Sequence, residues 1–145
     1  MNKSFFYFLV DIETMGNQSH SAIVSIGAIE FDINTGETGK TFYRNVSLQS
    51  SLNVGLKVTA DTVMWWMRQS EEARTKLTTD LVSLETALTE FSQFCNNTYE
   101  VWGNSARFDL GLLQNAYEAI GQPICWDFRK ERCVRTLVSF RPEIK

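Results

Sequence analysis

The sequence is poor in the cysteines that cross-link small domains and in the long apolar segments that mark membrane proteins. Its three cysteines, in a chain of 145 residues, are an odd number and lack the paired spacing of a zinc site. They indicate reduced thiols in a reducing compartment rather than a disulfide framework. The apolar stretch at the N-terminus is about seven residues long, too short for a signal peptide or a membrane span. We therefore expect a cytoplasmic protein that does not associate with a membrane.

The sequence also lacks a large excess of charge of one sign, since 14 basic residues stand against 17 acidic ones. The surface as a whole does not indicate a nucleic-acid partner. The charge is uneven, however, because residues 129–145 hold six basic and two acidic side chains. This basic segment fits either a contact with a phosphate backbone or a solvated helix face. No repeat or linker divides the chain, and its length is typical of one domain.

The first informative motif is Asp11-Ile12-Glu13, which follows an apolar run at residues 5–10. Such a run is typical of a strand buried on both faces. Residues two apart on a strand point to the same face, so Asp11 and Glu13 should converge while Ile12 enters the core. Convergent carboxylates are suitable ligands for magnesium or manganese. The alternative is that both acids simply end a strand where it reaches solvent.

The remaining pattern predicts an α/β protein with a mixed sheet of about five strands, helices on both faces and the first strand near its centre. We expect an antiparallel meander through 22–32 and 40–46, and a polar loop at 47–53. Sites in open sheets of this kind collect at the carboxyl ends of the central strands. The other expected elements are helices at 62–69 with Asp61 as N-cap, 84–96, 107–120 and 129–140, and short strands at 100–103 and 124–127.

The second motif runs from Gly103 to Asp109, out of a strand and into a helix. Asn104 or Ser105 would serve as N-cap and place Asp109 in the first turn, where the helix dipole favours a carboxylate by about 0.3–1 kcal/mol. That alone would explain Asp109. If strand 100–103 lies beside the first strand, however, Asp109 joins the other two acids. Three carboxylates in one place repel each other unless a cation neutralises them, so the two motifs together favour a metal site.

Segments 11–16 and 103–109 resemble the first and second exonuclease motifs of the DEDD superfamily of 3′-5′ exonucleases. The whole chain resembles the compact bacterial and phage branch, which includes the phage exonuclease A type and mycobacterial-type 3′-5′ exoribonucleases. Residues 23–28, 61–72 and 132–137 carry further similarity. The resemblance implies the ribonuclease H-like fold, two-metal hydrolysis of phosphodiester bonds and a nucleic-acid 3′ end, of RNA or DNA, as the partner.

The same resemblance implies roles for three acids. Asp11 would bridge two magnesium or manganese ions, Glu13 would bind the ion beside the nucleophile, and Asp109 would bind the other ion. These three residues are the predicted catalytic and metal-binding groups.

Predicted substrate contacts come from both motifs. Thr14, Met15 and Gly16 should lie near the terminal nucleotide, with Met15 either against the last base or in the core. Asn104 and Phe108 are the candidates from the second motif. Of the tandem pair Trp65-Trp66, one side chain should be buried, and the other is either simply exposed or stacks on a base.

The third motif of the superfamily, a late His-x-x-x-x-Asp, is lacking. The single histidine is His20, in a polar loop, and the acids after Asp127 are Glu131 and Glu143. We expect residues 1–145 to be one exonuclease-like domain that ends before this motif, as a trimmed form or a naturally shorter relative. A homodimer in which a second chain supplies the missing groups is a third explanation. The alternative function is a catalytically inactive module that binds nucleic acid or protein.

Overall fold

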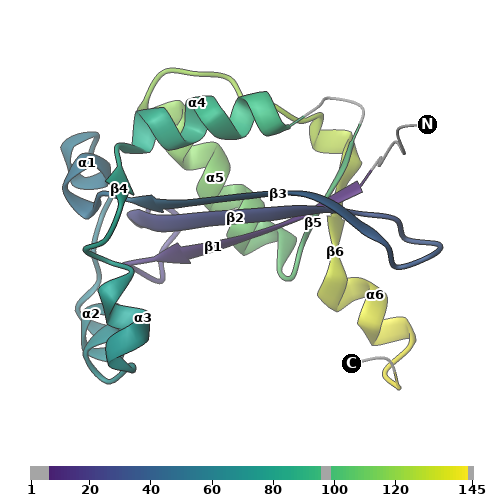
Figure 1. The fold of residues 1–145 in the computed structure, drawn as a ribbon, viewed down its shortest axis with the longest axis horizontal. Coiled ribbons are helices and arrows are strands. Elements are labelled where there is room, and N and C mark those ends of the chain that lie inside the picture. The colour runs from purple at the N-terminus through teal and green to yellow at the C-terminus, as the bar shows by residue number, and fades with distance from the viewer. Residues whose placement is uncertain (1–6, 96–98, 144–145) are drawn as a thin grey trace.

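A computed structural model describes residues 7–95 and 99–143. Its centre is a mixed six-stranded sheet in the order β4-β3-β2-β1-β5-β6. Strand β1 (Tyr7–Thr14) is an interior strand of this sheet, as the sequence predicts (Figure 1). The expected positions Phe5, Phe6 and Asn96 lie outside the described residues. The predicted α/β class with a mixed sheet is confirmed, with one strand more than expected.

The neighbours of β1 determine what lies beside its carboxyl end. Strands β2 (Ile23–Phe31) and β3 (Thr38–Val46) follow as the predicted antiparallel meander. On the other side, β5 (Glu100–Gly103) pairs with β1 in parallel, with Val10 opposite Gly103. Because parallel strands end at the same edge of a sheet, the segment after β5 begins beside the end of β1.

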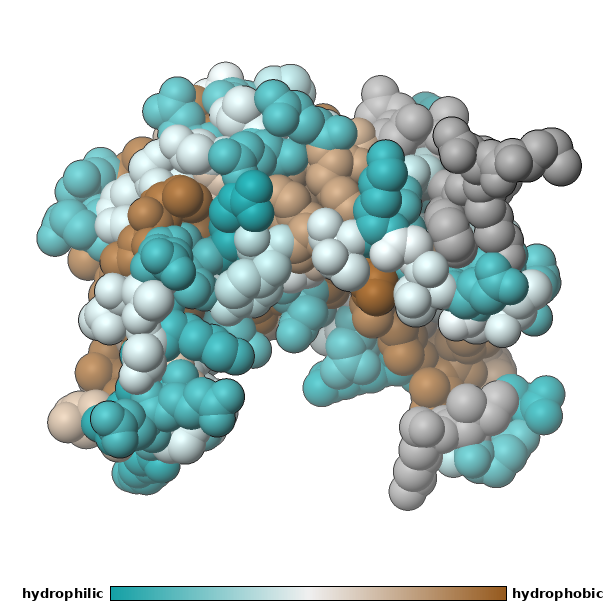
Figure 2. Space-filling model, in the orientation of Figure 1, coloured by the Kyte–Doolittle hydropathy of each residue, from teal (hydrophilic) through white to brown (hydrophobic). Residues whose placement is uncertain are grey.

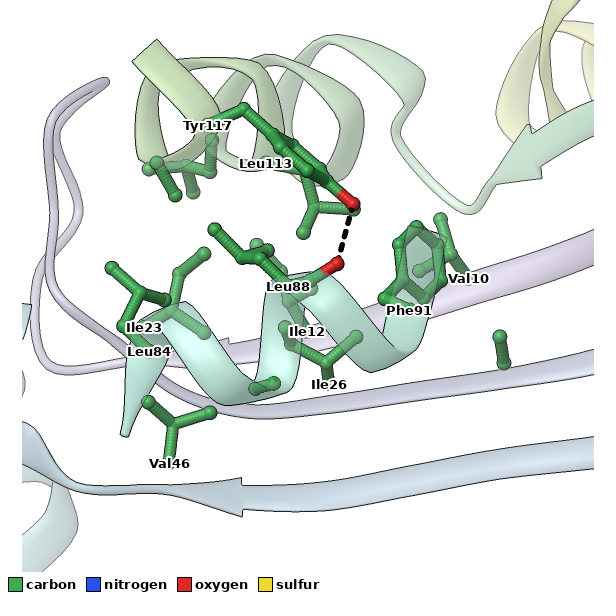
Figure 3. Packing of buried hydrophobic residues seen from close by; sticks show 14 of the residues in the cluster. Val10, Ile12, Ile23, Ile26, Val46, Leu84, Leu88, Phe91, Leu113 and Tyr117 are labelled. Atoms are coloured by element: carbon green, nitrogen blue, oxygen red, sulfur yellow. Dashed lines mark hydrogen bonds between the residues drawn. The ribbon is translucent and has the colours of Figure 1, made fainter. Parts of the chain in front are cut away.

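One face of the sheet carries the core. Helices α4 (Leu84–Phe94) and α5 (Ala106–Ala119) pack against it, and Val10 and Ile12 of β1 point toward them (Figure 3). The helical period predicted for α4 is confirmed, because Leu84, Ala87, Leu88 and Phe91 are at most 1% exposed and Phe94 is partly buried. The Tyr117 hydroxyl of α5 donates a hydrogen bond to the Leu88 carbonyl of α4 at 3.1 Å, the dashed line in Figure 3.

The opposite face is covered only at its two ends. Helices α2 (Ala60–Met67) and α3 (Glu71–Thr75) flank one end, and α6 (Val134–Phe140) flanks the other (Figure 1). Figure 2 shows the molecule hollowed between these two helical ends. The middle of this open face is accessible, and it is the face toward which Asp11 and Glu13 point.

Two predictions near α1 and α2 are wrong in detail. The expected loop at 47–53 contains α1 (Leu48–Asn53), because Ser47 caps the helix and the buried Ser51 hydroxyl donates to the Ile23 carbonyl. Helix α2 starts two residues earlier than expected, with Thr59 as N-cap, so Asp61 lies in its first turn instead of capping it.

The C-terminal prediction is also corrected. No strand forms at 124–127; Trp126 is buried there and its indole N–H donates to Glu131 at 2.7 Å. The last strand is β6 (Glu131–Cys133), which adds to the edge of β5, and it follows a short 3-10 turn, η1 (Phe128–Lys130). The expected helix at 129–140 therefore begins only at Val134. The short β4 (Leu81–Val82) is the unexpected sixth strand. No helix within the described ranges is long and apolar enough to cross a membrane.

The tandem tryptophans of α2 allow a matched stability test. The Trp66 indole N–H donates to the Thr14 carbonyl at 2.9 Å and ties α2 to the end of β1, whereas Trp65 is 48% exposed. We expect Trp66→Phe to lower the free energy of unfolding by about 1–3 kcal/mol, because it leaves a buried carbonyl unpaired. Trp65→Phe should change it by less than about 0.5 kcal/mol. Urea unfolding followed by circular dichroism measures both; equal losses would contradict the assignment.

Candidate active site

Asp11 and Glu13 lie on the open face of β1, as the alternation predicts. Ile12 between them is 3% exposed and belongs to the core, while both acids are exposed. Their partners across the sheet are the small residues Gly27 and Ser25 of β2. A β-bulge between Glu13 and Thr14 ends the regular pairing. Such bulges change the direction of side chains and are common next to active sites. The two carboxylates therefore lie side by side on the open face, where their cross-strand neighbours have small side chains.

Asp109 reaches the same place from α5, which begins directly after β5. It lies in the first turn and is 4% exposed, and Ser105 occupies the N-cap position without a side-chain capping bond. A Cβ at Gly103 would lie 3.3 Å from the Asp109 Oδ2 atom and 3.2 Å from the Ala106 Cα atom. Gly103 therefore lets α5 pack tightly enough to bring Asp109 to β1. A glycine at the last strand position before a helix was the sequence signal for this role.

The three carboxylates influence one another electrostatically. Burial, reinforced by the charge of Asp11, raises the pKa of Asp109 to about 6, although backbone amides of Ile12 and Ser105 oppose the shift. Burial, with the charges of Asp11 and Asp109, also raises the pKa of Glu13. Asp11 is exposed at its tip but partly desolvated by the surrounding chain, which raises its pKa against the Ile12 amide. At Glu13 and Asp109 the repulsion that the sequence predicts therefore adds to the larger effect of burial.

Carboxylate oxygens are suitable ligands for hard divalent cations, but the three acids do not surround a single ion. Among residues 7–95 and 99–143, no three His, Cys, Asp or Glu side chains stand close enough to enclose one ion. Two-metal sites share their carboxylates between ions, so each ion needs fewer protein ligands and takes the rest from water and substrate. The donor set therefore suits a site that is completed by the substrate.

Two cations from the flanking helices face these acids. Lys76, directly after α3, favours the ionised form of Glu13 and lowers its pKa, and Arg135 of α6 does the same for Asp109. Arg135 shows that part of the basic segment turns toward the site. Other members of that segment are paired elsewhere, Arg132 with Glu100 at 3.2 Å and Arg141 with Glu143 at 2.5 Å. Lys76 had no signal in the sequence, because a lysine at an exposed helix end is ordinary.

A groove of about 380 Å³ separates the carboxylates from α2 and α3, and we call it the carboxylate groove. Trp65 and Lys76 line its helical wall, and Tyr43 of β3 lines the sheet side. Trp65 packs edge-on against the buried Trp66 with ring centroids 5.1 Å apart, so the prediction that one tryptophan is buried is confirmed. The Trp65 ring is held in place while much of it remains accessible.

The predicted substrate contacts from the first motif lie mostly below the surface. Thr14, Met15 and Gly16 are all buried, and the Thr14 hydroxyl donates to the Gly16 carbonyl at 2.7 Å. Met15 is 6% exposed and packs in the core. The two candidates from the second motif, Asn104 and Phe108, are exposed around the start of α5.

Neither replacement for the missing motif reaches the carboxylates. His20 is exposed, and its Nδ1 atom lies 3.2 Å from the Ser19 hydroxyl. Glu143 pairs with Arg141. In the part of the chain that the structure describes, the site therefore holds three acids and no histidine.

Comparison with known proteins agrees with this geometry. The model of the 3′-5′ exoribonuclease Rv2179c-like domain family matches residues 7–145. The chain belongs to this family. A curated relative of the Rv2179c-like chain is the exodeoxyribonuclease of enterobacteria phage T4, 32% identical over 74% of the chain and 54% of the relative. The chain thus spans about half the length of that enzyme.

Solved structures share the fold of this Rv2179c-like domain. E. coli exonuclease I in complex with a dT13 oligonucleotide superposes with a TM-score of 0.68 at 17% identity, over 95% of the chain and 30% of exonuclease I. The zinc-bound form of the E. coli exonuclease I complex with single-stranded DNA gives a TM-score of 0.61 at 19% identity, over 95% and 30% of the two chains. The ribonuclease H-like DEDD fold expected from the motifs is confirmed.

The raised pKa of Asp109 predicts a stability effect in metal-free protein. The ordinary pKa of an aspartate is 3.8, and that of Asp109 in the folded protein is about 6. Between these two pH values the folded state binds the carboxyl proton more tightly than the unfolded state, so stability falls as the pH rises. We expect Asp109→Asn to raise the free energy of unfolding at pH 7.5 by about 1–3 kcal/mol and to flatten this slope.

Urea unfolding in EDTA at pH 4 and pH 7.5 tests this prediction. The exposed acid Asp61 is a matched control, and Asp61→Asn should give no gain at either pH. Added Mn²⁺ should stabilise the wild type more than Asp109→Asn. A variant that is equally or less stable than the wild type at pH 7.5 in EDTA would contradict the repulsion.

Proposed function

We propose that the protein is a magnesium- or manganese-dependent 3′-5′ exonuclease that releases mononucleotides from single-stranded nucleic acid. The observation that carries the proposal is the convergence of Asp11, Glu13 and Asp109 at one end of the sheet, in a chain of an exonuclease family. The metal-bound and DNA-bound forms of exonuclease I support the same chemistry by analogy of fold.

The three acids would hold the divalent ions. Such ions lower the pKa of an attacking water and neutralise charge on the leaving 3′ oxygen. The chain itself contributes a fixed cluster of negative charge that a cation relieves. Lys76 and Arg135, which face this cluster from opposite helices, would contact the phosphate that lies over it.

The carboxylate groove would receive the 3′-terminal nucleoside. Trp65 presents a half-exposed ring beside the carboxylates, and an aromatic face stacks on any base at about 1–3 kcal/mol per base. The Tyr43 hydroxyl donates to the Asn45 carboxamide at 2.6 Å, which stiffens the opposite wall. An aromatic wall of this kind binds any of the bases by stacking, as an exonuclease without sequence preference requires.

The relatives differ in the sugar named for their substrates, since the family is described as exoribonuclease and the phage relative as exodeoxyribonuclease. Both RNA and DNA strands of the same sequence are therefore assayed. Discrimination between them would come from contacts to the 2′-hydroxyl.

Activity is tested with 3′-labelled single-stranded oligonucleotides. We expect Mn²⁺-dependent release of labelled mononucleotide, abolished by Asp11→Ala and unchanged by Glu85→Ala, which removes an exposed acid on α4. Because no described histidine reaches the site, turnover should be slower than in relatives with a general base by about 10²- to 10⁴-fold. Single-turnover assays with enzyme in excess are therefore appropriate.

Failure of release under these conditions would reject the enzymatic proposal. If the wild type bound the oligonucleotide but released nothing in Mg²⁺ or Mn²⁺, the chain would be a binding module with an exonuclease fold. Release that persisted in Asp11→Ala would show contamination or a different site.

A further inference from the structure

Two of the three cysteines meet in the helical layer that covers the core face of the sheet. Cys95 ends α4 as its C-cap, and Cys125 lies in the segment after α5, 30 positions further along the chain. The Cys95 thiol donates a hydrogen bond to the Cys125 carbonyl at 2.9 Å, and the two side chains are also hydrogen-bonded to each other. The two sulfurs are therefore neighbours, as a disulfide requires.

The two thiols differ in exposure and in acidity. Cys95 is 9% exposed and belongs to the core, whereas Cys125 is partly exposed and its Sγ atom lies 3.5 Å from the Tyr117 hydroxyl. Hydrogen bonding by Cys95, aided by Tyr117, lowers the pKa of the Cys125 thiol against the effect of burial. The same pairing, together with burial, raises the pKa of the Cys95 thiol.

This division is typical of a redox-sensitive pair. The thiolate is the nucleophilic form of cysteine, so the more acidic and more accessible Cys125 is the thiol that meets an oxidant first. Cys95 lies beside it with its proton retained, in the position of a resolving thiol. Two cysteines that served only as small apolar core residues would need neither the mutual hydrogen bond nor the difference in exposure.

The segment that contains Cys125 connects the core to β6 and α6. Residues 122–127 form neither helix nor strand, and none of the α6 residues is buried, so the position of α6 depends on what precedes it. Trp126 holds this segment from one side, because it is 3% exposed and donates to Glu131. A covalent bond between Cys125 and Cys95 would attach the same segment to the end of α4.

We propose that Cys95 and Cys125 form a reversible disulfide when a peroxide oxidises the protein, which makes them a modification site separate from the carboxylates. The Cys125 thiolate attacks one oxygen of hydrogen peroxide, the O–O bond breaks, and a sulfenic acid forms while the departing hydroxide takes up the thiol proton as water. The Cys95 sulfur then loses its proton and attacks the Cys125 sulfur, the S–O bond breaks, and a second water leaves. Two thiols are oxidised, and one peroxide is reduced to two waters.

The wild-type protein tests the disulfide directly. It is treated with hydrogen peroxide, its remaining thiols are alkylated under denaturing conditions, and its peptides are mapped by mass spectrometry. We expect alkylation at Cys133 alone and a linked pair of peptides that contain Cys95 and Cys125. Dithiothreitol should release this link by thiol–disulfide exchange and restore alkylation at all three cysteines. Alkylation of all three after peroxide treatment, a link through Cys133, or a sulfinic acid at Cys125 without a link would overturn the inference.

Thermal unfolding tests whether the bond fastens the segment. Oxidation should raise Tm of the wild type by about 5–10 °C, and dithiothreitol should reverse the shift. Cys125→Ser and Cys95→Ser should each lose this shift. Cys133→Ser is the matched control and should keep it, because the Cys133 sulfur lies at the N-cap of α6, near the Asn104 carbonyl. A shift that persists in Cys125→Ser, or that is lost in Cys133→Ser, would overturn the inference whatever the outcome of the nuclease assay.

Discussion

The site depends on one electrostatic constraint, which is that the backbone holds three carboxylates together where burial, and repulsion at Glu13 and Asp109, disfavour their ionisation. Asp11 and Glu13 cannot turn away, because a slip of one residue would bury both acids and expose Ile12. Asp109 cannot withdraw, because it lies in the first turn of a helix packed against β5. The core thus maintains an arrangement that is unfavourable without a cation, and this cost at the central strand is the physical reason for proposing that the site binds cations.

Small residues make this arrangement sterically feasible. Gly103 allows α5 to approach the strand, whereas Gly27, opposite Asp11, has room for a Cβ at ordinary contact distances. The cations come from elsewhere, since Lys76 and Arg135 reach the acids from the helices that flank the two ends of that face. The site is therefore assembled from distant segments, and its negative charge comes from β1 and α5.

The predictable parts were those with a strict local period. Alternation in β1 placed Asp11 and Glu13 together, and the helical period defined α4. The failures were short elements decided by tertiary contacts. Residues 124–127 have the apolar composition of a strand, but Trp126 instead packs against Tyr117, with ring centroids 6.2 Å apart. The charged segment Glu131–Cys133 becomes a strand only because the edge of β5 accepts it. Lys76 had no local signal at all, since its role depends on where α3 packs.

The exceptions to good packing lie where a bound nucleic-acid strand would run. The described buried polar side chains are hydrogen-bonded throughout the core, apart from the Trp102 indole nitrogen on the open face. Around the carboxylates, by contrast, the Trp65 ring is half-exposed on the wall of the carboxylate groove. Exposed aromatic rings also occur elsewhere, at Phe128 and Phe140, but neither of these lines the groove. A nucleic acid bound over the acidic cluster would cover Trp65, and its bases and phosphates have the chemistry that suits the aromatic ring and the flanking cations.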